Sequence, residues 1–302
     1  MASPVTPAAP FGHVLTAMVT PFRGDGGIDL DGAQRLASHL VDQGNDGLVV
    51  GGTTGESPTT SDTEKDAVLR AVLEAVGDRA SVVAGAGTND TRHSIELAEA
   101  AEKAGAHGVL LVTPYYNKPP QAGLVQHFTA VADAVGLPVL LYDIPHRTGT
   151  AIETQTLLRL AEHPRIVANK DAKGVLAAAS RVMAGSDLVY YSGDDVLTLP
   201  LLAVGAVGVV GVATHLATPR IAELVSAFRA GDAARALALH RELLPVFVGL
   251  FRTQAAITTK DALGHLGLPG GPVRLPLPEL TAEQRAQLHR DLAAGGVDGF
   301  AA

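Results

Sequence analysis

A lysine near the end of a predicted β-strand is the residue of this chain best suited to covalent chemistry. Of the six lysines, only Lys170 lies inside an apolar, β-branched run, residues 166–171. Burial disfavours the ammonium ion, so a shielded lysine can reach a pKa of about 7 to 8 and attack a ketone as the free amine. The alternative is a structural lysine that extends out of the strand end or pairs with Asp171. Lys173 is a rival, but it follows the strand beside Gly174, where we expect solvent around it.

Two other segments could serve such an amine. Tyr142 closes the preceding apolar run, 138–142, so its phenol can reach the amine and move protons during imine formation. The alternative is an aromatic residue that fills the core. Thr53 and Thr54 lie in a Gly-rich turn, whose free backbone N–H groups can bind a carboxylate while a threonine hydroxyl relays protons. As a turn motif alone, this is a weak signal.

Arg147 and a pair of tyrosines lie in neighbouring polar loops. Arg147 follows Tyr142 closely and can hold a substrate carboxylate through two parallel hydrogen bonds, with a plain surface ion pair as the equal alternative. Tyr115 and Tyr116 follow Pro114, and adjacent tyrosines in such a loop more often anchor the loop or an interface than catalyse. Each of these residues is a weak signal alone and becomes a catalytic candidate only together with the other predicted site residues.

No metal site is predicted. The eleven histidines show neither HxH nor HExxH spacing, and the chain has no cysteine. Asp194 and Asp195 follow Gly193 and are more simply a loop or helix-start feature than cation ligands. The Gly-rich stretches match neither dinucleotide-binding nor phosphate-loop spacing.

Eight apolar runs alternate with helical segments and must position these residues. Runs that are apolar throughout suit parallel strands covered on both faces. Eight βα units predict a closed (β/α)8 barrel rather than a doubly wound sheet, which would carry a Gly-rich phosphate turn after its first strand. In such a barrel the candidate residues all fall at the carboxyl ends of the strands, where active sites lie. The predicted strands are 14–20, 47–51, 81–85, 108–113, 138–142, 166–171, 188–192 and 208–213.

The remaining segments give the predicted organisation of the chain. Residues 1–12 are interpreted as a flexible arm, 13–231 as the barrel and 232–302 as a C-terminal helical appendix. Ser61 and Glu64 form a predicted capping box, and Thr218 before Pro219 predicts a helix N-cap.

Composition excludes several classes of function. The 302 residues are 47% hydrophobic and carry a net charge of -8, without a cluster of basic and aromatic residues for nucleic acid or an anionic membrane. No uncharged apolar run of about 18 residues predicts a membrane span. The absence of cysteine and of a secretory leader pattern favours a reducing compartment, and we expect the cytoplasm.

Taken together, the segments resemble the dihydrodipicolinate synthase and N-acetylneuraminate lyase superfamily over about residues 12–293. The resemblance implies that Lys170 forms an imine with pyruvate without any added cofactor. Tyr142 would be the phenol beside the imine, and Thr53 and Tyr116 would complete a proton relay. The motifs that follow the family's order and spacing are GTTGES at 52–57, YDIPHRTG at 142–149, KDAKG at 170–174 and SGDD at 192–195.

The resemblance also implies binding roles and partners. Thr53 and Thr54 would hold the pyruvate carboxylate, and Arg147 would hold the second substrate. The backbones of Gly193 and Val210 would contact bound intermediates. Because the family's counterpart of Tyr116 reaches into a neighbouring subunit's site, a homo-oligomer is implied, and we expect a tetramer built as a dimer of dimers.

Arg147 and Tyr116 favour the synthase branch of the family over the lyase branch. That branch condenses pyruvate with L-aspartate 4-semialdehyde in lysine (diaminopimelate) biosynthesis. Asp143 stands where Asn is common, Lys173 where Thr is common, and Asn169 is polar. These departures leave the imine chemistry untouched and concern the second substrate, so one alternative is another pyruvate-dependent aldolase for a sugar acid or hydroxy-oxo acid. A second alternative is a catalytically silent protein that binds an oxo acid, against which the presence of Lys170, Tyr142 and Thr53 argues.

The resemblance extends to an effector site for lysine. Ser57, Asn89 and Tyr115 match that site in lysine-sensitive members, whereas His93 stands where those members have Glu and Lys65 where they have His. The missing carboxylate would pair with the effector's ammonium group. We therefore expect weak lysine inhibition or none.

Overall fold

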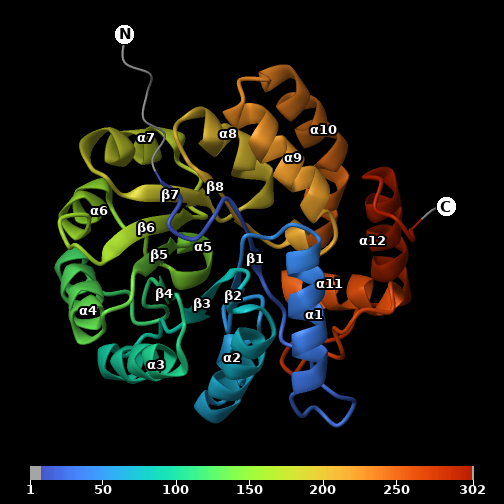
Figure 1. Ribbon diagram of the computed structural model, residues 1–302, viewed down its shortest axis with the longest axis horizontal. Helices are drawn as coiled ribbons and strands as arrows, with labels where there is room; N and C mark the ends of the chain where they lie inside the picture. The colour runs from blue at the N-terminus through green and yellow to red at the C-terminus, as the bar shows by residue number, and fades with distance from the viewer. Residues whose placement is uncertain (1–7, 301–302) are drawn as a thin grey trace.

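The computed structural model describes residues 8–300, and eight parallel strands form a closed barrel at its centre. The strands follow chain order around the barrel, and β8 closes it by pairing with β1 (Figure 1). The strands are β1 Val14–Ala17, β2 Gly47–Val50, β3 Ser81–Gly85, β4 Gly108–Val112, β5 Val139–Asp143, β6 Ile166–Asp171, β7 Val189–Ser192 and β8 Gly208–Gly211. The predicted (β/α)8 barrel is confirmed, and β6 has the predicted bounds.

Helices surround the barrel and continue beyond its eighth unit. The α-helices are α1 Leu30–Asp42, α2 Asp62–Val76, α3 Thr91–Ala104, α4 Gln121–Ala134, α5 Pro145–Thr148, α6 Thr154–Leu160, α7 Leu176–Gly185, α8 Thr198–Ala203, α9 Thr218–Arg229, α10 Ala233–Leu250, α11 Ala255–His265 and α12 Ala282–Ala294. Short 3-10 helices follow three strands, η1 Ser57–Thr59, η2 Asp195–Leu197 and η3 Ala213–His215. In the described part of the chain, no helix is long and apolar enough to cross a membrane.

Two strands, β1 and β8, end two or three residues before the predicted apolar runs. The run from residue 14 to 20 ends as a strand at Ala17, and the N–H of Val19 donates to the ring nitrogen Nε2 of His215. The last run ends at Gly211 because the N–H groups of the next two residues donate to the carboxylate of Asp195. Side chains from other elements thus replace the neighbouring strand as hydrogen-bond partners.

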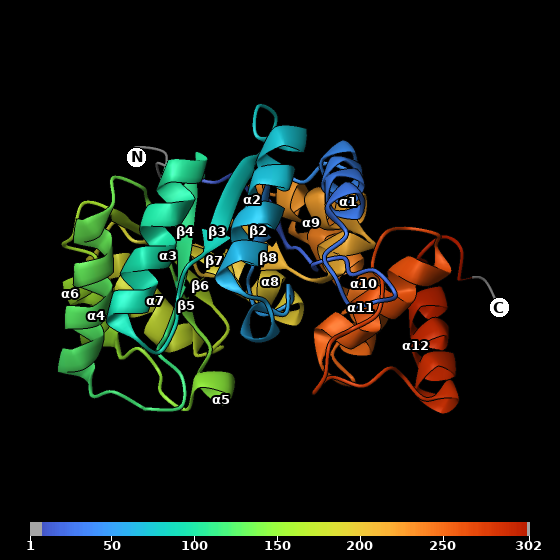
Figure 2. The ribbon, with the colours of Figure 1, turned by 90° about the horizontal axis from the view of Figure 1, so that it is seen from below.

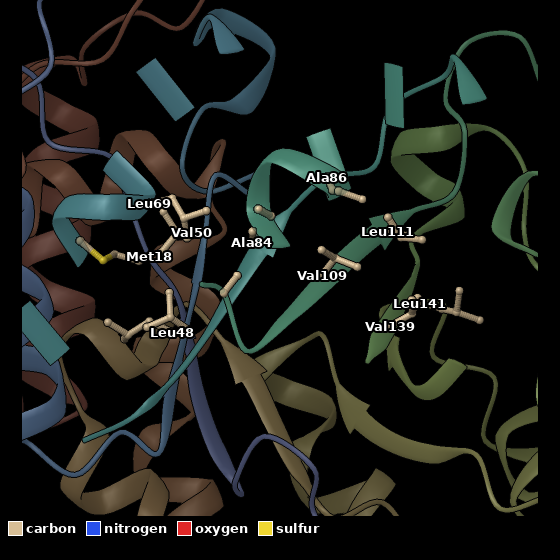
Figure 3. Packing of buried hydrophobic residues seen from close by; sticks show 14 of the residues in the cluster. Met18, Leu48, Val50, Leu69, Ala84, Ala86, Val109, Leu111, Val139 and Leu141 are labelled. Atoms are coloured by element: carbon tan, nitrogen blue, oxygen red, sulfur yellow. The ribbon is translucent and has the colours of Figure 1, made fainter. Parts of the chain in front are cut away.

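Strand residues alternate between two hydrophobic clusters, as the pleat of a β-strand requires. Leu140 and Tyr142 of β5 belong to a cluster drawn almost entirely from strands, which places them inside the barrel. Leu141 belongs instead to a larger cluster that includes residues of the surrounding helices (Figure 3). Since Tyr142 pairs with Lys170 in the β5–β6 register, Lys170 also points inward.

The helix caps agree with the sequence at one position and differ at another. Ser61 and Glu64 form the predicted capping box at the start of α2. The predicted N-cap Thr218 is wrong by one residue, because α9 begins at Thr218 and Ala217 is its N-cap. The Thr218 hydroxyl donates backward to the carbonyl of Thr214, which is the bond of a helical residue rather than of a cap.

The C-terminal helices α10, α11 and α12 lie together at one side of the barrel, near α9 and α1 (Figures 1 and 2). They share a hydrophobic cluster with Val14 of β1 and Val209 of β8. The predicted boundary at 231/232 falls between α9 and α10. Of the predicted N-terminal arm, residues 1–7 lie outside the described residues, and Phe11 is buried with its N–H on the hydroxyl of Tyr191.

Candidate active site

Lys170 is buried inside the barrel with 4% of its surface exposed. Burial lowers its pKa to about 8, the positive charge of Arg147 acts in the same direction, and the carboxylate of Asp195 opposes both. Its Nζ lies 4.2 Å from the centre of the Tyr142 ring. A lysine in this setting holds a far larger fraction of neutral, nucleophilic amine than one in water.

Tyr142 is the nearest aromatic partner of that amine. Burial raises the pKa of its phenol, while the positive charge of Arg147 and the side chain of Thr53 act against this shift. The phenol therefore remains protonated near neutral pH and can donate a hydrogen bond. The predicted proximity of Lys170, Tyr142 and Thr53 matches the structure.

A cavity of about 240 Å³ opens beside Tyr142 at the carboxyl ends of β2 to β5. Thr53 lines one wall and Arg147 another, so the side chains predicted to bind two carboxylates face the same space. No carboxylate among residues 8–300 forms an ion pair with Arg147, which argues against the surface ion pair considered as the alternative. Tyr115 also lines the cavity, and burial raises the pKa of its phenol.

Gly193 adjoins Lys170, and Val210 lies elsewhere in the barrel interior. A Cβ atom on Gly193 would lie 2.9 Å from Cγ of Lys170, so the glycine leaves space for the lysine stem. Val210 is fully buried among the residues of the barrel interior. Thr54 is buried beside Thr53 in the turn after β2.

Asp195 is an electrostatic partner that sequence reasoning missed. It is buried, and burial raises its pKa to about 6, opposed by hydrogen bonds from the N–H groups of Val212 and Ala213 and by the charge of Lys170. Asp194 is the N-cap of η2, as the helix-start interpretation predicted. The sequence offered no local signal for Asp195, since its influence on Lys170 crosses from one strand end to another.

The prediction that Lys173 is solvated is wrong. Its ammonium group forms an ion pair with Asp143 at 2.8 Å and donates to the carbonyl of Ile152 at 2.8 Å. Both side chains are largely or fully buried. Lys173 is therefore already engaged as a cation, which removes it as a rival nucleophile to Lys170.

Tyr116 lies apart from the other predicted relay residues. Its side chain is 90% exposed, and its φ of 73° is in the left-handed region that few non-glycine residues adopt. The structure does not bring it together with Thr53 and Tyr142 within one chain. A strained backbone that presents a bare aromatic ring is typical of a functional constraint rather than of packing.

A charge network supports the turn that carries Thr53 and Thr54. Glu56, in the left-handed region at a φ of 56°, forms a buried ion pair with Lys260 of α11 at 2.5 Å. Its other carboxylate oxygen accepts from the backbone N–H of Arg274 at 2.9 Å. The Arg274 guanidinium donates to the carbonyl of Thr59 at 2.7 Å. The C-terminal region thus holds the active-site turn in place.

Within residues 8–300, no group of three or more metal-ligating side chains comes together. A metal centre therefore has no support from the described side chains. The chemistry available here is that of an amine, a phenol and threonine hydroxyls, with a guanidinium group in the lining of the same cavity.

Comparisons with known proteins agree with this arrangement. A model described as the dihydrodipicolinate synthetase family matches residues 10–295. The chain is 68% identical to 4-hydroxy-tetrahydrodipicolinate synthase 2 of Streptomyces coelicolor, with 98% of this chain and 99% of that protein covered. It is 69% identical to the 4-hydroxy-tetrahydrodipicolinate synthase of Acidothermus cellulolyticus, with 97% and 95% covered. A lysine-bound crystal structure of the enzyme from Cyanidioschyzon merolae matches with a TM-score of 0.94 at 43% identity, with 96% and 99% covered. The chain belongs to the dihydrodipicolinate synthetase family.

Proposed function

We propose that this chain condenses pyruvate with L-aspartate 4-semialdehyde through an imine on Lys170, the reaction of a 4-hydroxy-tetrahydrodipicolinate synthase. Relatives with that name match nearly the whole chain. The observation that carries the proposal is the buried amine of Lys170, with its lowered pKa, beside the Tyr142 ring. On composition, with no cysteine in the chain, we also propose the cytoplasm as its location.

The first step is attack of the neutral Lys170 amine on the ketone carbon of pyruvate. With a pKa of about 8, about a tenth of the amine is neutral at pH 7, against about one part in three thousand for an ordinary lysine. The C–N bond forms, the amine loses its protons, and the carbonyl oxygen leaves as water. The protonated Tyr142 phenol can donate a proton to that oxygen, and Thr53 beside it can pass protons onward.

Two binding roles accompany this chemistry. Thr53 and Thr54 hold the pyruvate carboxylate through the hydroxyls and N–H groups of their turn. Arg147 holds the carboxylate of the aldehyde substrate, since it lines the cavity and has no ionic partner among the described side chains. The backbones of Gly193 and Val210, next to Lys170 and in the barrel interior, contact the bound intermediates.

Tyr116 acts in a neighbouring subunit of a homo-oligomer, which we propose is a tetramer. The support is its exposed ring on a strained backbone, which no contact within one chain explains. Mixing Tyr116→Phe and Lys170→Ala subunits tests this role. Mixed oligomers should regain activity that neither variant shows alone, because some sites combine an intact lysine with an intact tyrosine. Failure to regain activity in proven mixed oligomers contradicts the role.

The synthase activity is tested by assaying condensation of pyruvate with a panel of aldehydes that differ in carboxylate and hydroxyl groups. L-Aspartate 4-semialdehyde should give the highest kcat/KM, because its carboxylate can pair with Arg147. A higher kcat/KM for a sugar-derived aldehyde would instead identify an aldolase with the same imine chemistry and another physiological substrate. Lys170→Ala is the matched control and should be inactive with every aldehyde.

A further inference from the structure

The loop of residues 144–152 connects β5 to α6 and includes the short helix α5, which carries Arg147. Its first half is internally bonded, since the N–H of Arg147 donates to the carbonyl of Ile144. Its last residue, Ile152, is fully buried. The position of Arg147 therefore depends on how the two ends of this loop are fixed.

Two charged side chains hold the far end of the loop. The N–H of Ile152 donates to Oδ1 of Asp143 at 3.1 Å, and its carbonyl accepts from Nζ of Lys173 at 2.8 Å. Oδ2 of Asp143 completes the triangle as the ion-pair partner of Lys173, also at 2.8 Å. Both backbone groups of one loop residue are thus bound by one buried ion pair, which we name the Ile152 clamp.

The clamp is anchored to the ends of two adjacent strands. Asp143 is the last residue of β5, and the N–H of Ala172 donates to its carbonyl at 3.0 Å. Just after β6, the N–H of Lys173 donates to Oδ1 of Asp171 at 2.9 Å. These anchors tie the loop to the barrel strands. A second anchor comes from α4, where Gln121 donates to the carbonyl of Ala151 at 2.9 Å and accepts from the N–H of Glu153 at 3.1 Å.

The clamp lies on the opposite side of the strands from the imine lysine. Tyr142 and Lys170 point into the barrel, and the residues that follow them in β5 and β6 point outward because side chains alternate along a strand. A change in the clamp should therefore move the loop without repositioning the Lys170 amine.

We propose that Asp143 and Lys173 are positioning residues that fix Arg147 for the second substrate. This inference rests on the proposed function, in which Arg147 binds the aldehyde's carboxylate. The pair contributes to specificity through the loop and takes no part in forming the pyruvate imine.

The test compares two half-reactions in Lys173→Met and in the double variant Asp143→Ala/Lys173→Met. The double variant removes both bonds to Ile152 and leaves neither member of the ion pair buried without its partner, so it remains informative if the single variant folds poorly. Arg165→Met is the control, because Arg165 precedes β6 and also bonds a backbone carbonyl and a carboxylate, those of Ala132 and Asp133, but in a more exposed pair away from the loop. The measurements are KM for each substrate and borohydride trapping of pyruvate on Lys170.

Both clamp variants should raise KM for the aldehyde about tenfold or more, as expected when a charge-assisted bond is weakened. Pyruvate KM and trapping should stay within about twofold of wild type, as should every parameter of Arg165→Met. Lys173→Met added to Arg147→Ala should raise the aldehyde KM by less than about a further twofold, because the clamp acts through Arg147.

Three results would overturn the proposal. They are an unchanged aldehyde KM in both clamp variants, a parallel loss of pyruvate trapping, and a full additional effect in the Arg147→Ala background. Failure of the proposed function is distinct from these, since it would appear as wild-type enzyme that traps no pyruvate.

Discussion

Replacing Lys260 by Met should show that the C-terminal helices support the active-site turn. Lys260 is only 3% exposed, its ammonium group pairs with Glu56, and it lies 3.9 Å from the centre of the Phe22 ring. Burial lowers its pKa to about 8, which the bond and charge of Glu56 oppose. Methionine keeps most of the apolar stem but leaves the carboxylate of Glu56 buried without its cation.

The magnitude follows from the ion pair and the ring contact that are lost, together with the bond from Nζ of Lys260 to the carbonyl of Pro272. Breaking a buried ion pair by removing one partner costs about 3 to 5 kcal/mol. Loss of the contact with the Phe22 ring adds about 0.5 to 2 kcal/mol. The backbone N–H of Arg274 still donates to Glu56, so we expect the free energy of unfolding to fall by about 4 kcal/mol, near the lower end of the summed range. KM for pyruvate should rise because the turn with Thr53 and Thr54 loosens.

Denaturant unfolding and pyruvate kinetics measure the two effects, with Asp261→Asn as the matched control. Asp261 is the next residue of α11, and its partner Arg285 is 45% exposed, so its loss should change stability by about 1 kcal/mol or less. Adding Glu56→Gln to Lys260→Met should recover part of the stability by removing the unpaired charge. Equal losses in Lys260→Met and Asp261→Asn, or a pyruvate KM unchanged by Lys260→Met, would refute the reasoning.

Three further predictions concern the substrates and the effector. Arg147→Ala should lower kcat/KM for the aldehyde about ten- to a hundredfold, because it removes a charge-assisted bond to that substrate. Pyruvate trapping should stay within about twofold of wild type. Equal damage to both half-reactions would show that Arg147 has a structural role instead. The rate of pyruvate trapping should rise with pH and level off above about pH 8, since burial lowers the pKa of Lys170 to that value and only the neutral amine attacks; a rise that continues towards pH 10.5 would mean an ordinary lysine. L-Lysine should not half-inhibit the enzyme at sub-millimolar concentrations, because the Asp62 carboxylate is already bound by Lys65 at 3.3 Å and His93 at 2.8 Å and is not available to the effector's ammonium group. Initial rates at fixed substrates and rising L-lysine test this, and half-inhibition in the sub-millimolar range would contradict it.

The barrel was predictable because each unit repeats the same local signal. β3 and β6 have the predicted bounds. The ends of β1 and β8 were predicted too late in the chain. The apolar residues continue beyond each strand, but the backbone N–H groups there bond to the side chains of His215 and Asp195. Those partners come from distant parts of the chain, and no local pattern announces them.

The site divides in the same way. The proximity of Lys170, Tyr142 and Thr53 was predictable because strand ends of a barrel meet at one face. Lys173 was wrongly expected in solvent because its partner Asp143 is on another strand, and the neighbouring Gly174 suggested an open turn. Ion pairs that form only when separate strands assemble cannot be predicted from the sequence of one segment.

Borohydride reduction in the presence of pyruvate, followed by peptide mapping with mass spectrometry, tests the central claim most directly. Reduction traps an imine as a stable secondary amine on the lysine that formed it. We predict one reduced pyruvyl group per chain on Lys170, and none in Lys170→Ala, which should retain the melting temperature of wild type within a few degrees. A label on Lys173, or no label on the wild-type chain, would contradict the account.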